Sequence, residues 1–328
     1  MTHPLGDGIY RITLPLPFPS PQSVNCYLFE GEKGLTLLDC GIDGVEEFEL
    51  LIRALEGFGF GLPDLHRLVA SHLHVDHMGM AKRIIDTTGC DWLMHASTIA
   101  EIPHYNDWGS RRDELARVVE ASGAPDEVVE RFRLETLRPA WFSEAIRPTH
   151  PVGDGHKIPL SPTRHLEVIF TPGHQANHLC LLDSRTGRLF SGDHVLPRIS
   201  PFIPYTGEGH DHLGAYLDSL ERIAGLDARE TYPGHGPTIA RGSARAHQIL
   251  LHHQRRLDAM LEVVAECPRT PWHVMQAVFR PNLSSLEERL AFQETMAHLE
   301  YLRSRSRVER VSREGRWAYR IPDVGREV

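Results

Sequence analysis

The sequence contains few cysteines and no long apolar segment. Its 328 residues include five cysteines, an odd number without any Cys-x-x-Cys spacing, so we expect reduced thiols and a cytoplasmic location. No run approaches the roughly 18 consecutive apolar residues that a membrane-spanning helix needs. The N-terminus also lacks the basic and apolar regions of a signal peptide. These absences argue against a disulfide scaffold and a membrane protein.

The sequence also lacks an excess of positive charge. It carries 35 basic against 44 acidic residues, a net charge of −9, whereas a generic nucleic-acid binder is basic overall. Residues 241–328 differ, with 15 basic and 11 acidic side chains. We therefore expect a small-molecule substrate and keep nucleic acid as the less favoured partner.

The order of the predicted elements is typical of an α/β protein of about two domains. Short apolar or alternating runs predict strands, and one segment with helical periodicity, residues 45–58, interrupts them. The predicted strands are residues 8–14, 24–29, 35–38, 68–70, 166–170, 179–182 and 189–190, and the pattern closes at 231–237.

Two further regions are predicted to be helical. Residues 110–121 and 126–137, flanked by Trp108, Trp141 and Phe142, predict a helical hairpin inserted at about 97–150. It could be a lid lining a substrate pocket, a packed satellite or a dimer contact. Beyond residue 243, three helices (244–264, 271–279 and 285–304) precede a basic hairpin (308–311 and 317–321), which is the order of a winged helix. We thus predict domains at 1–242 and 243–328.

Histidine is abundant, and one cluster of histidines has the spacing of a metal site. Of the 21 histidines, His72, His74 and His77 lie with Asp76 directly after the predicted strand 68–70. The period of two places His72 and His74 on one side, while Asp76 and His77 approach from the other. Each of two neighbouring ions would then have its own pair of ligands. Imidazole and carboxylate suit zinc, iron or manganese, and the absence of thiolate argues against a closed structural zinc site.

Three later turns can complete this site. Each contains glycine and follows an apolar run, and each offers one residue of a metal-binding type: His174, Asp193 and His235. Glycine there allows the backbone to approach the ions closely. A single histidine is usually a surface or core residue, but this series in this order predicts a dinuclear metal site.

These motifs closely resemble the pattern of the metallo-β-lactamase superfamily over about residues 8–240. The resemblance implies an αββα sandwich, with the helical insertion and the C-terminal winged helix added to it, and metals at one edge. It also implies two divalent ions, with zinc favoured over iron or manganese. Carried over position by position, the ligands of the first metal would be His72, His74 and His174, those of the second Asp76, His77 and His235, with Asp193 bridging both.

The aspartate at position 193 narrows the expected reaction. β-Lactamases of this superfamily have cysteine there, whereas glyoxalase II-type thioesterases, lactonases and nucleases have aspartate. We therefore expect a hydrolase of a small-molecule thioester or ester, similar to hydroxyacylglutathione hydrolases. A hydroxide held between the metals would attack the carbonyl, and Asp76 would orient it. The alternatives are a lactonase, an endoribonuclease of the lactamase-β-like group, suggested by the winged-helix order, and a non-enzymatic regulator.

Several other residues have both a functional and a structural interpretation. Tyr205, Trp108 and His194 are candidate substrate contacts, although a packed loop tyrosine, a packed tryptophan and a loop histidine are equally ordinary. His178 is expected to make a structural hydrogen bond. His253, on a long polar helix, is expected at the surface. The sequence leaves a homodimer open.

Overall fold

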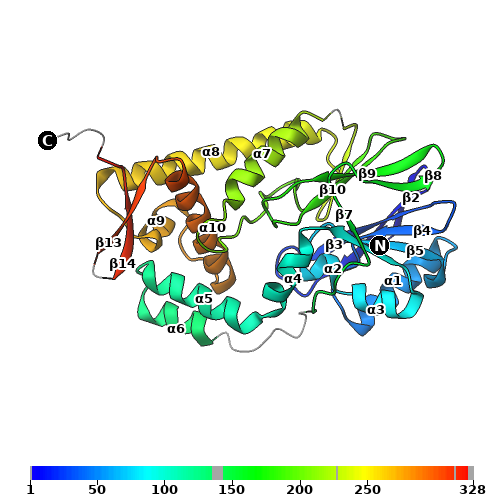
Figure 1. Ribbon diagram of the computed structural model, residues 1–328, viewed down its shortest axis with the longest axis horizontal. Coiled ribbons are helices and arrows are strands. Elements are labelled where there is room, and N and C mark those ends of the chain that lie inside the picture. Colours follow the sequence, from blue (N-terminus) through cyan, green and yellow to red (C-terminus); the bar gives the residue numbers. More distant parts are fainter. Residues whose placement is uncertain (1, 135–142, 227, 314, 324–328) are drawn as a thin grey trace. The chain divides into compact units, whose positions relative to one another are not determined.

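The protein folds into two compact units in a computed structural model, which describes residues 2–134, 143–226, 228–313 and 315–323. The first unit comprises residues 1–106, 139–201 and 219–247, and the second comprises residues 107–138, 202–218 and 248–328. Figure 1 shows the elements of both units with their labels.

The first unit contains two β-sheets. The seven-stranded sheet has the order β1-β2-β3-β4-β5-β6-β7, and the five-stranded sheet has the order β12-β11-β10-β9-β8. The first is formed by β1 (Thr2–Gly6), β2 (Ile9–Pro15), β3 (Ser23–Phe29), β4 (Leu35–Leu38), β5 (Leu65–Val69), β6 (Asp91–His95) and β7 (His150–Val152). The second is formed by β8 (Lys157–Ser161), β9 (Arg164–Phe170), β10 (Leu179–Asp183), β11 (Leu189–Gly192) and β12 (Thr231–Pro233).

Strand β3 shows why the two sheets stack. Almost all of its side chains are buried, and with a period of two they alternate between two separate cores. Val24, Cys26 and Leu28 belong to a core shared with helices. Tyr27 and Phe29 belong to a core shared with side chains of β8, β9, β10 and β11. A strand with two apolar faces must be covered on both, which requires a layer on each side of the seven-stranded sheet.

Helices cover the outer faces of the sandwich. The apolar side chains of α1 (Val45–Gly57) and α3 (Ala81–Thr88) enter the core on the outer side of the seven-stranded sheet, along which Figure 1 shows both helices. On α7 (His212–Ala224), Ser219 Oγ donates to the carbonyl of Pro172 at 2.9 Å, next to the five-stranded sheet. The predicted αββα sandwich is therefore confirmed.

Parallel pairing brings several strand ends to one edge. Strands β4, β5 and β6 run parallel to one another, as do β11 and β12. The loops after β4, β5, β9, β11 and β12 carry Asp39, His72–His77, His174, Asp193 and His235. The fold thus gathers at one edge the side chains that the sequence separates by up to 196 positions.

The second unit is mainly helical. Its elements include α5 (Trp108–Ala121), α6 (Asp126–Leu134), most of α8 (Gly242–Glu266), α9 (Pro271–Val278), α10 (Ser285–Ser304) and the hairpin β13 (Glu309–Arg313) and β14 (Arg316–Arg320). Thr270 caps α9, and a capping box of Ser284 and Glu287 begins α10. Three helices followed by a hairpin match the predicted order, and the winged-helix assignment stays a prediction.

The helices of the predicted insertion divide between the units. Helix α4 (Thr98–Asn106) belongs to the first unit, while α5 and α6 belong to the second. The amide of Trp272 donates to the carbonyl of Ser122 at 3.2 Å, and the rings of Phe132 and Phe292 lie 6.5 Å apart. Thus α5 and α6 pack against α9 and α10. Trp141 and Phe142 lie outside the described residues.

None of the helices in the described part of the chain is long and apolar enough to cross a membrane.

Candidate metal centre

The first predicted motif begins where β5 ends. His72 lies in the bend after β5, and His74, with an extended backbone, is the N-terminal capping residue of the short helix α2 (Val75–Met78). Asp76 and His77 lie on α2, and the centre of the His77 ring is 4.2 Å from that of His72. His72 and His77 are fully buried, and Asp76 is also buried.

The structure brings the seven predicted ligands together in two groups. His72, His74, His174 and Asp193 form one group and Asp76, His77 and His235 the other; within each, the ligand atoms lie within 4.8 Å of one another. His74 Nδ1 lies 3.0 Å from His174 Nε2 in the first group. In the second, His235 Nε2 lies 3.3 Å from Asp76 Oδ2.

Asp193 contacts both groups. Its Oδ2 lies 3.3 Å from His235 Nε2 and 3.8 Å from His174 Nε2, and its Oδ1 lies 3.5 Å from His77 Nε2. A carboxylate in this position can serve as a ligand to two ions at once, as the resemblance implied.

Asp39, which directly follows β4 and is not among the predicted ligands, organises this centre. It has a left-handed backbone conformation (φ 59°), and its Oδ2 lies 2.7 Å from His77 Nδ1. Ser71 Oγ donates to the same carboxylate at 2.9 Å and also contacts His72 Nδ1 at 2.9 Å. Histidines that bind metals usually donate their other ring N–H to such a partner. Asp39 thus orients both imidazoles, and only its place after β4 signals this in the sequence.

His178 holds Asp193 in position. Its Nδ1 lies 2.8 Å from Thr171 Oγ1, and its Nε2 accepts the Asp193 backbone N–H at 3.2 Å. The predicted structural hydrogen bond is therefore present. The neighbouring Asn177 accepts from the Leu73 amide at 3.2 Å and donates to Glu101 Oε2 at 2.8 Å, which links this loop to the first motif.

Contacts from the seven-stranded sheet fix the loop of His235. The Asn25 amide group donates to the carbonyls of Pro233 and Gly236, and the Tyr27 hydroxyl donates to Pro233 at 2.7 Å. His235 Nδ1 donates to the carbonyl of Ser23 at 2.7 Å, which directs Nε2 toward the carboxylates. Gly234 is needed because a Cβ there would lie 2.5 Å from Asp193 Oδ1 and 2.7 Å from His77 Cε1.

The two groups differ in their electrostatics. Burial lowers the pKa of His72 well below its ordinary value and lowers the pKa of His74 to about 3, so these imidazoles are neutral and present lone pairs. Burial also disfavours the charged form of His235, but Asp193 and Asp76 outweigh it and raise its pKa to about 10. The pKa of Asp76 is lowered to about 2 because His77 and His235 outweigh burial.

These residues fit a pair of divalent metal ions. Within the described part of the chain, the buried His72 Nε2 and His77 Nε2 have no hydrogen-bond partner, although burying a polar atom without one is costly. Neighbouring carboxylates, Asp193 foremost, outweigh burial and raise the pKa of His77 as they do that of His235, so the two rings carry the positive charge that a cation would otherwise supply. Imidazole and carboxylate are the ligands that zinc and iron accept.

The three predicted substrate contacts lie in different places. His194, in the first unit, is fully buried, with its ring 5.8 Å from that of His178. Tyr205 and Trp108 belong to the second unit. Burial, with the charge of Glu300, raises the pKa of Tyr205 to about 12, and Arg111 lies over the Trp108 ring at 5.7 Å. A role in substrate binding stays a prediction for all three.

Comparison with known proteins agrees with this geometry. Residues 19–235 match the model of the metallo-beta-lactamase superfamily. The chain belongs to the metallo-β-lactamase superfamily. Residues 257–321 match the family described as metallo-beta-lactamase-like, C-terminal domain. The chain is therefore a metal-dependent hydrolase of this superfamily that also carries a metallo-beta-lactamase-like C-terminal domain.

Known relatives match most of the length of this chain. It is 26% identical to the probable metallo-hydrolase YqjP of Bacillus subtilis over 90% of this chain and 92% of the relative. It is 28% identical to the beta-lactamase-like protein 2 homolog of Caenorhabditis elegans, over 80% and 72% of the two chains. The crystal structure of the metallo-beta-lactamase family protein TTHA1429 from Thermus thermophilus superimposes with a TM-score of 0.81 at 29% identity, covering 97% of this chain and 100% of that one.

Proposed function

We propose that this metallo-hydrolase cleaves a small-molecule thioester or ester. The observation that carries the proposal is the position of Asp193, whose carboxylate contacts histidines of both metal-binding groups. A pair of metal ions there would supply Lewis acidity and activate water for attack on a carbonyl.

The residues of the chain have distinct tasks in this reaction. His72, His74 and His174 would hold one ion and Asp76, His77 and His235 the other, with Asp193 shared. Asp39 keeps His77 in the orientation that exposes Nε2 to the site. The carboxylate of Asp76, at 3.3 Å from His235 Nε2, lies at the edge of the second group, where it can accept a hydrogen bond from the attacking water.

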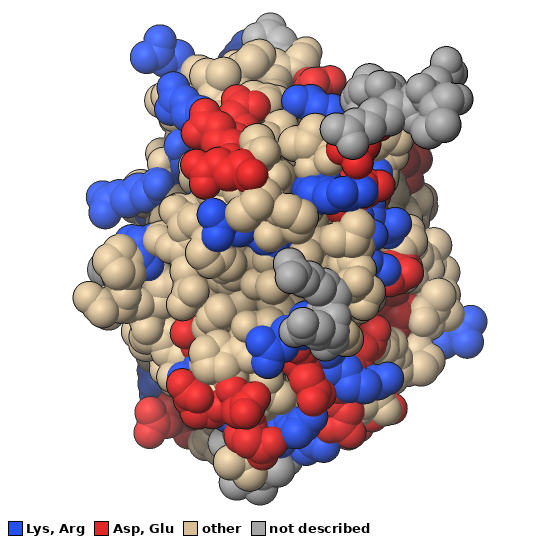
Figure 2. Space-filling view, turned by 90° about the vertical axis from the view of Figure 1, so that its left-hand side faces the viewer, with Lys and Arg blue, Asp and Glu red and all other residues tan. Residues whose placement is uncertain are grey.

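The endoribonuclease alternative is less well supported, because several arginines of the C-terminal hairpin region are paired with carboxylates. Arg303 bonds Glu300, Arg320 bonds Glu309, and Arg310 bonds Glu208. Figure 2 shows basic and acidic side chains interspersed on the face it displays. Arginines that are already paired contribute little to binding phosphates.

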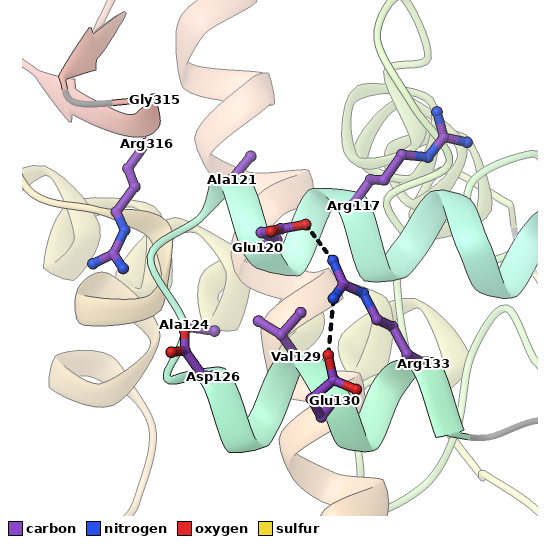
Figure 3. Close-up of a pocket in the computed structure, with 10 residues that line it drawn as sticks. All are labelled: Arg117, Glu120, Ala121, Ala124, Asp126, Val129, Glu130, Arg133, Gly315 and Arg316. Atoms are coloured by element: carbon purple, nitrogen blue, oxygen red, sulfur yellow. Dashed lines mark hydrogen bonds and ion pairs between the residues drawn. The ribbon is translucent and has the colours of Figure 1, made fainter.

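A pocket between α5, α6 and the tip of the hairpin does not favour phosphate binding either. It has a volume of about 610 Å³ and is lined by three arginines, Arg117, Arg133 and Arg316, and by three acids, Glu120, Asp126 and Glu130. Arg133 lies 2.6 Å from Glu120 and 2.8 Å from Glu130, as Figure 3 shows. The positive and negative charges of this pocket are equal in number, so it offers no excess positive charge that would attract a polyanion such as RNA. This agrees better with a small-molecule substrate than with RNA.

Thiol release from a panel of acyl thioesters tests the proposal. The protein is reconstituted with zinc, and the Asp76→Asn variant serves as the blank because it replaces an anionic ligand by a neutral amide, whose oxygen is a weaker ligand and a weaker hydrogen-bond acceptor for water. We expect turnover that falls at least about 100-fold in the variant while circular dichroism stays unchanged. No turnover on any thioester or ester, together with Asp76-dependent cleavage of single-stranded RNA or a lactone, would replace the proposal with that alternative.

A further inference from the structure

The second unit contains another cluster of metal-binding residue types, which the hydrolytic centre does not use. His253 of α8 and Glu294 and His298 of α10 offer three ligand atoms that lie within 4.8 Å of one another. The side chains of His253 and His298 are fully buried, and Glu294 is 8% exposed. The expected surface position of His253 is wrong, because α8 turns this residue inward, where its ring packs 5.5 Å from that of Tyr216.

Hydrogen bonds fix the tautomer of His298. Its Nδ1 donates to the backbone carbonyl of Glu294 at 2.7 Å, and a carbonyl can only accept, so the lone pair of the neutral ring is on Nε2. That Nε2 lies 3.0 Å from His253 Nδ1. The other ring nitrogen of His253, Nε2, is buried and has no hydrogen-bond partner among the residues described.

This arrangement repeats two features of the hydrolytic centre. There, His74 Nδ1 and His174 Nε2 also lie 3.0 Å apart, as nitrogens directed at a common ion do. There, too, a histidine, His235, donates Nδ1 to a backbone carbonyl at 2.7 Å and presents Nε2 to the site. An N–H to carbonyl bond behind the ligating nitrogen is typical of histidines that bind metals.

Glu294 provides the third ligand. Its carboxylate is paired through Oε1 with Arg256, and a carboxylate has a second oxygen that can bind a metal at the same time. The Arg256 guanidinium also lies 4.4 Å from the centre of the Phe279 ring, so it keeps a favourable contact when the carboxylate shares its charge with a cation. Two imidazoles and one carboxylate form a set that zinc accepts.

We propose that His253, Glu294 and His298 bind one divalent metal ion of the zinc type, which links α8 to α10. On binding, His253 Nδ1 becomes a ligand, and its proton moves to Nε2. Its three ligands are buried and none of them belongs to the hydrolytic centre, so the ion would hold the two helices together, with a water molecule as its fourth ligand.

The zinc content of the full-length protein tests this site. The protein is depleted with dipicolinate, saturated with zinc, freed of unbound metal and analysed by elemental mass spectrometry. We expect His298→Gln to hold one zinc per chain fewer than the wild type, with unchanged hydrolysis, and His247→Gln, which alters an exposed histidine of the same helix, to hold as many as the wild type. Equal zinc content in wild type and His298→Gln would overturn the proposal.

Cobalt provides a second readout. Cobalt is titrated into the wild type and into His253→Gln. The wild-type spectrum minus the variant spectrum should show the strong visible bands of a four-coordinate cobalt ion. If both variants fail to fold, the zinc content of the wild type still decides. We expect three zinc ions per chain, and a wild type that binds only two at saturation would overturn the proposal.

Discussion

At the scale of single residues, the most informative side chain is one outside the predicted ligand set. Asp39 contacts His77 directly and reaches His72 through Ser71. The carboxylate therefore sets which nitrogen of each ring carries the proton. Its role depends on contacts over 32 to 38 positions of the chain, so the local sequence around Asp39 does not encode it.

Replacing Asp39 with asparagine should weaken metal binding. The amide keeps the shape of the side chain but loses the charge that orients His77, so we expect affinity for zinc to fall about 10- to 100-fold. Competition with a chromogenic chelator measures this. The matched control is Asp43→Asn, which removes an exposed partner of Arg83 in the same loop. Equal affinities of the Asp39 variant and the wild type would refute the orienting role.

His235 should make the stability of the metal-free protein depend on pH. Its folded-state pKa is raised to about 10, above about 6.5 for an unfolded chain. Its contribution is thus fully present below pH 6.5 and is lost as pH rises toward 10, by up to about 1.4 kcal/mol per pH unit. Chemical denaturation of wild type and His235→Gln should show a stability difference that shrinks over this range. A difference independent of pH would contradict the assigned charge.

At the scale of elements, the sequence predicts strands and loops well where a local pattern decides. Strand β4 (Leu35–Leu38) has the predicted bounds, and α1 (Val45–Gly57) differs by one residue. The seven candidate ligands are found together because each follows the end of a strand. The sequence could not show that α5 and α6 pack with α9 and α10, or that His253 points inward, because these depend on contacts between distant segments.

Gly234, which lies between β12 and His235, offers a test of close packing in the metal centre. A methyl group at Gly234 would overlap Asp193 and His77, so Gly234→Ala should displace these ligands and lower zinc affinity at least about 10-fold. Gly153→Ala is the control, because a Cβ there meets no atom within 4 Å. Isothermal titration with zinc compares the two. Similar affinities would show that the loop adapts without cost to the site.

At the scale of the whole molecule, both sheets of the first unit contribute residues to the hydrolytic centre. The seven-stranded sheet supplies Asp39, His72, His74, Asp76 and His77 through the loops that follow its strands, and the five-stranded sheet supplies His174, Asp193 and His235. The sandwich must therefore be complete before the centre exists. Motif spacing predicted a dinuclear metal site, and the resemblance to the superfamily implied the sandwich and the assignment of each ligand, but the substrate depends on loop geometry that neither specifies.

The most direct test of this account is the metal content and turnover of Asp193→Ala. Because Asp193 contacts histidines of both groups, its loss should remove at least one metal ion per chain relative to the wild type and abolish hydrolysis, while the circular dichroism spectrum is retained. An Asp193→Ala protein that keeps the full wild-type metal content and turnover would contradict a centre bridged by this carboxylate.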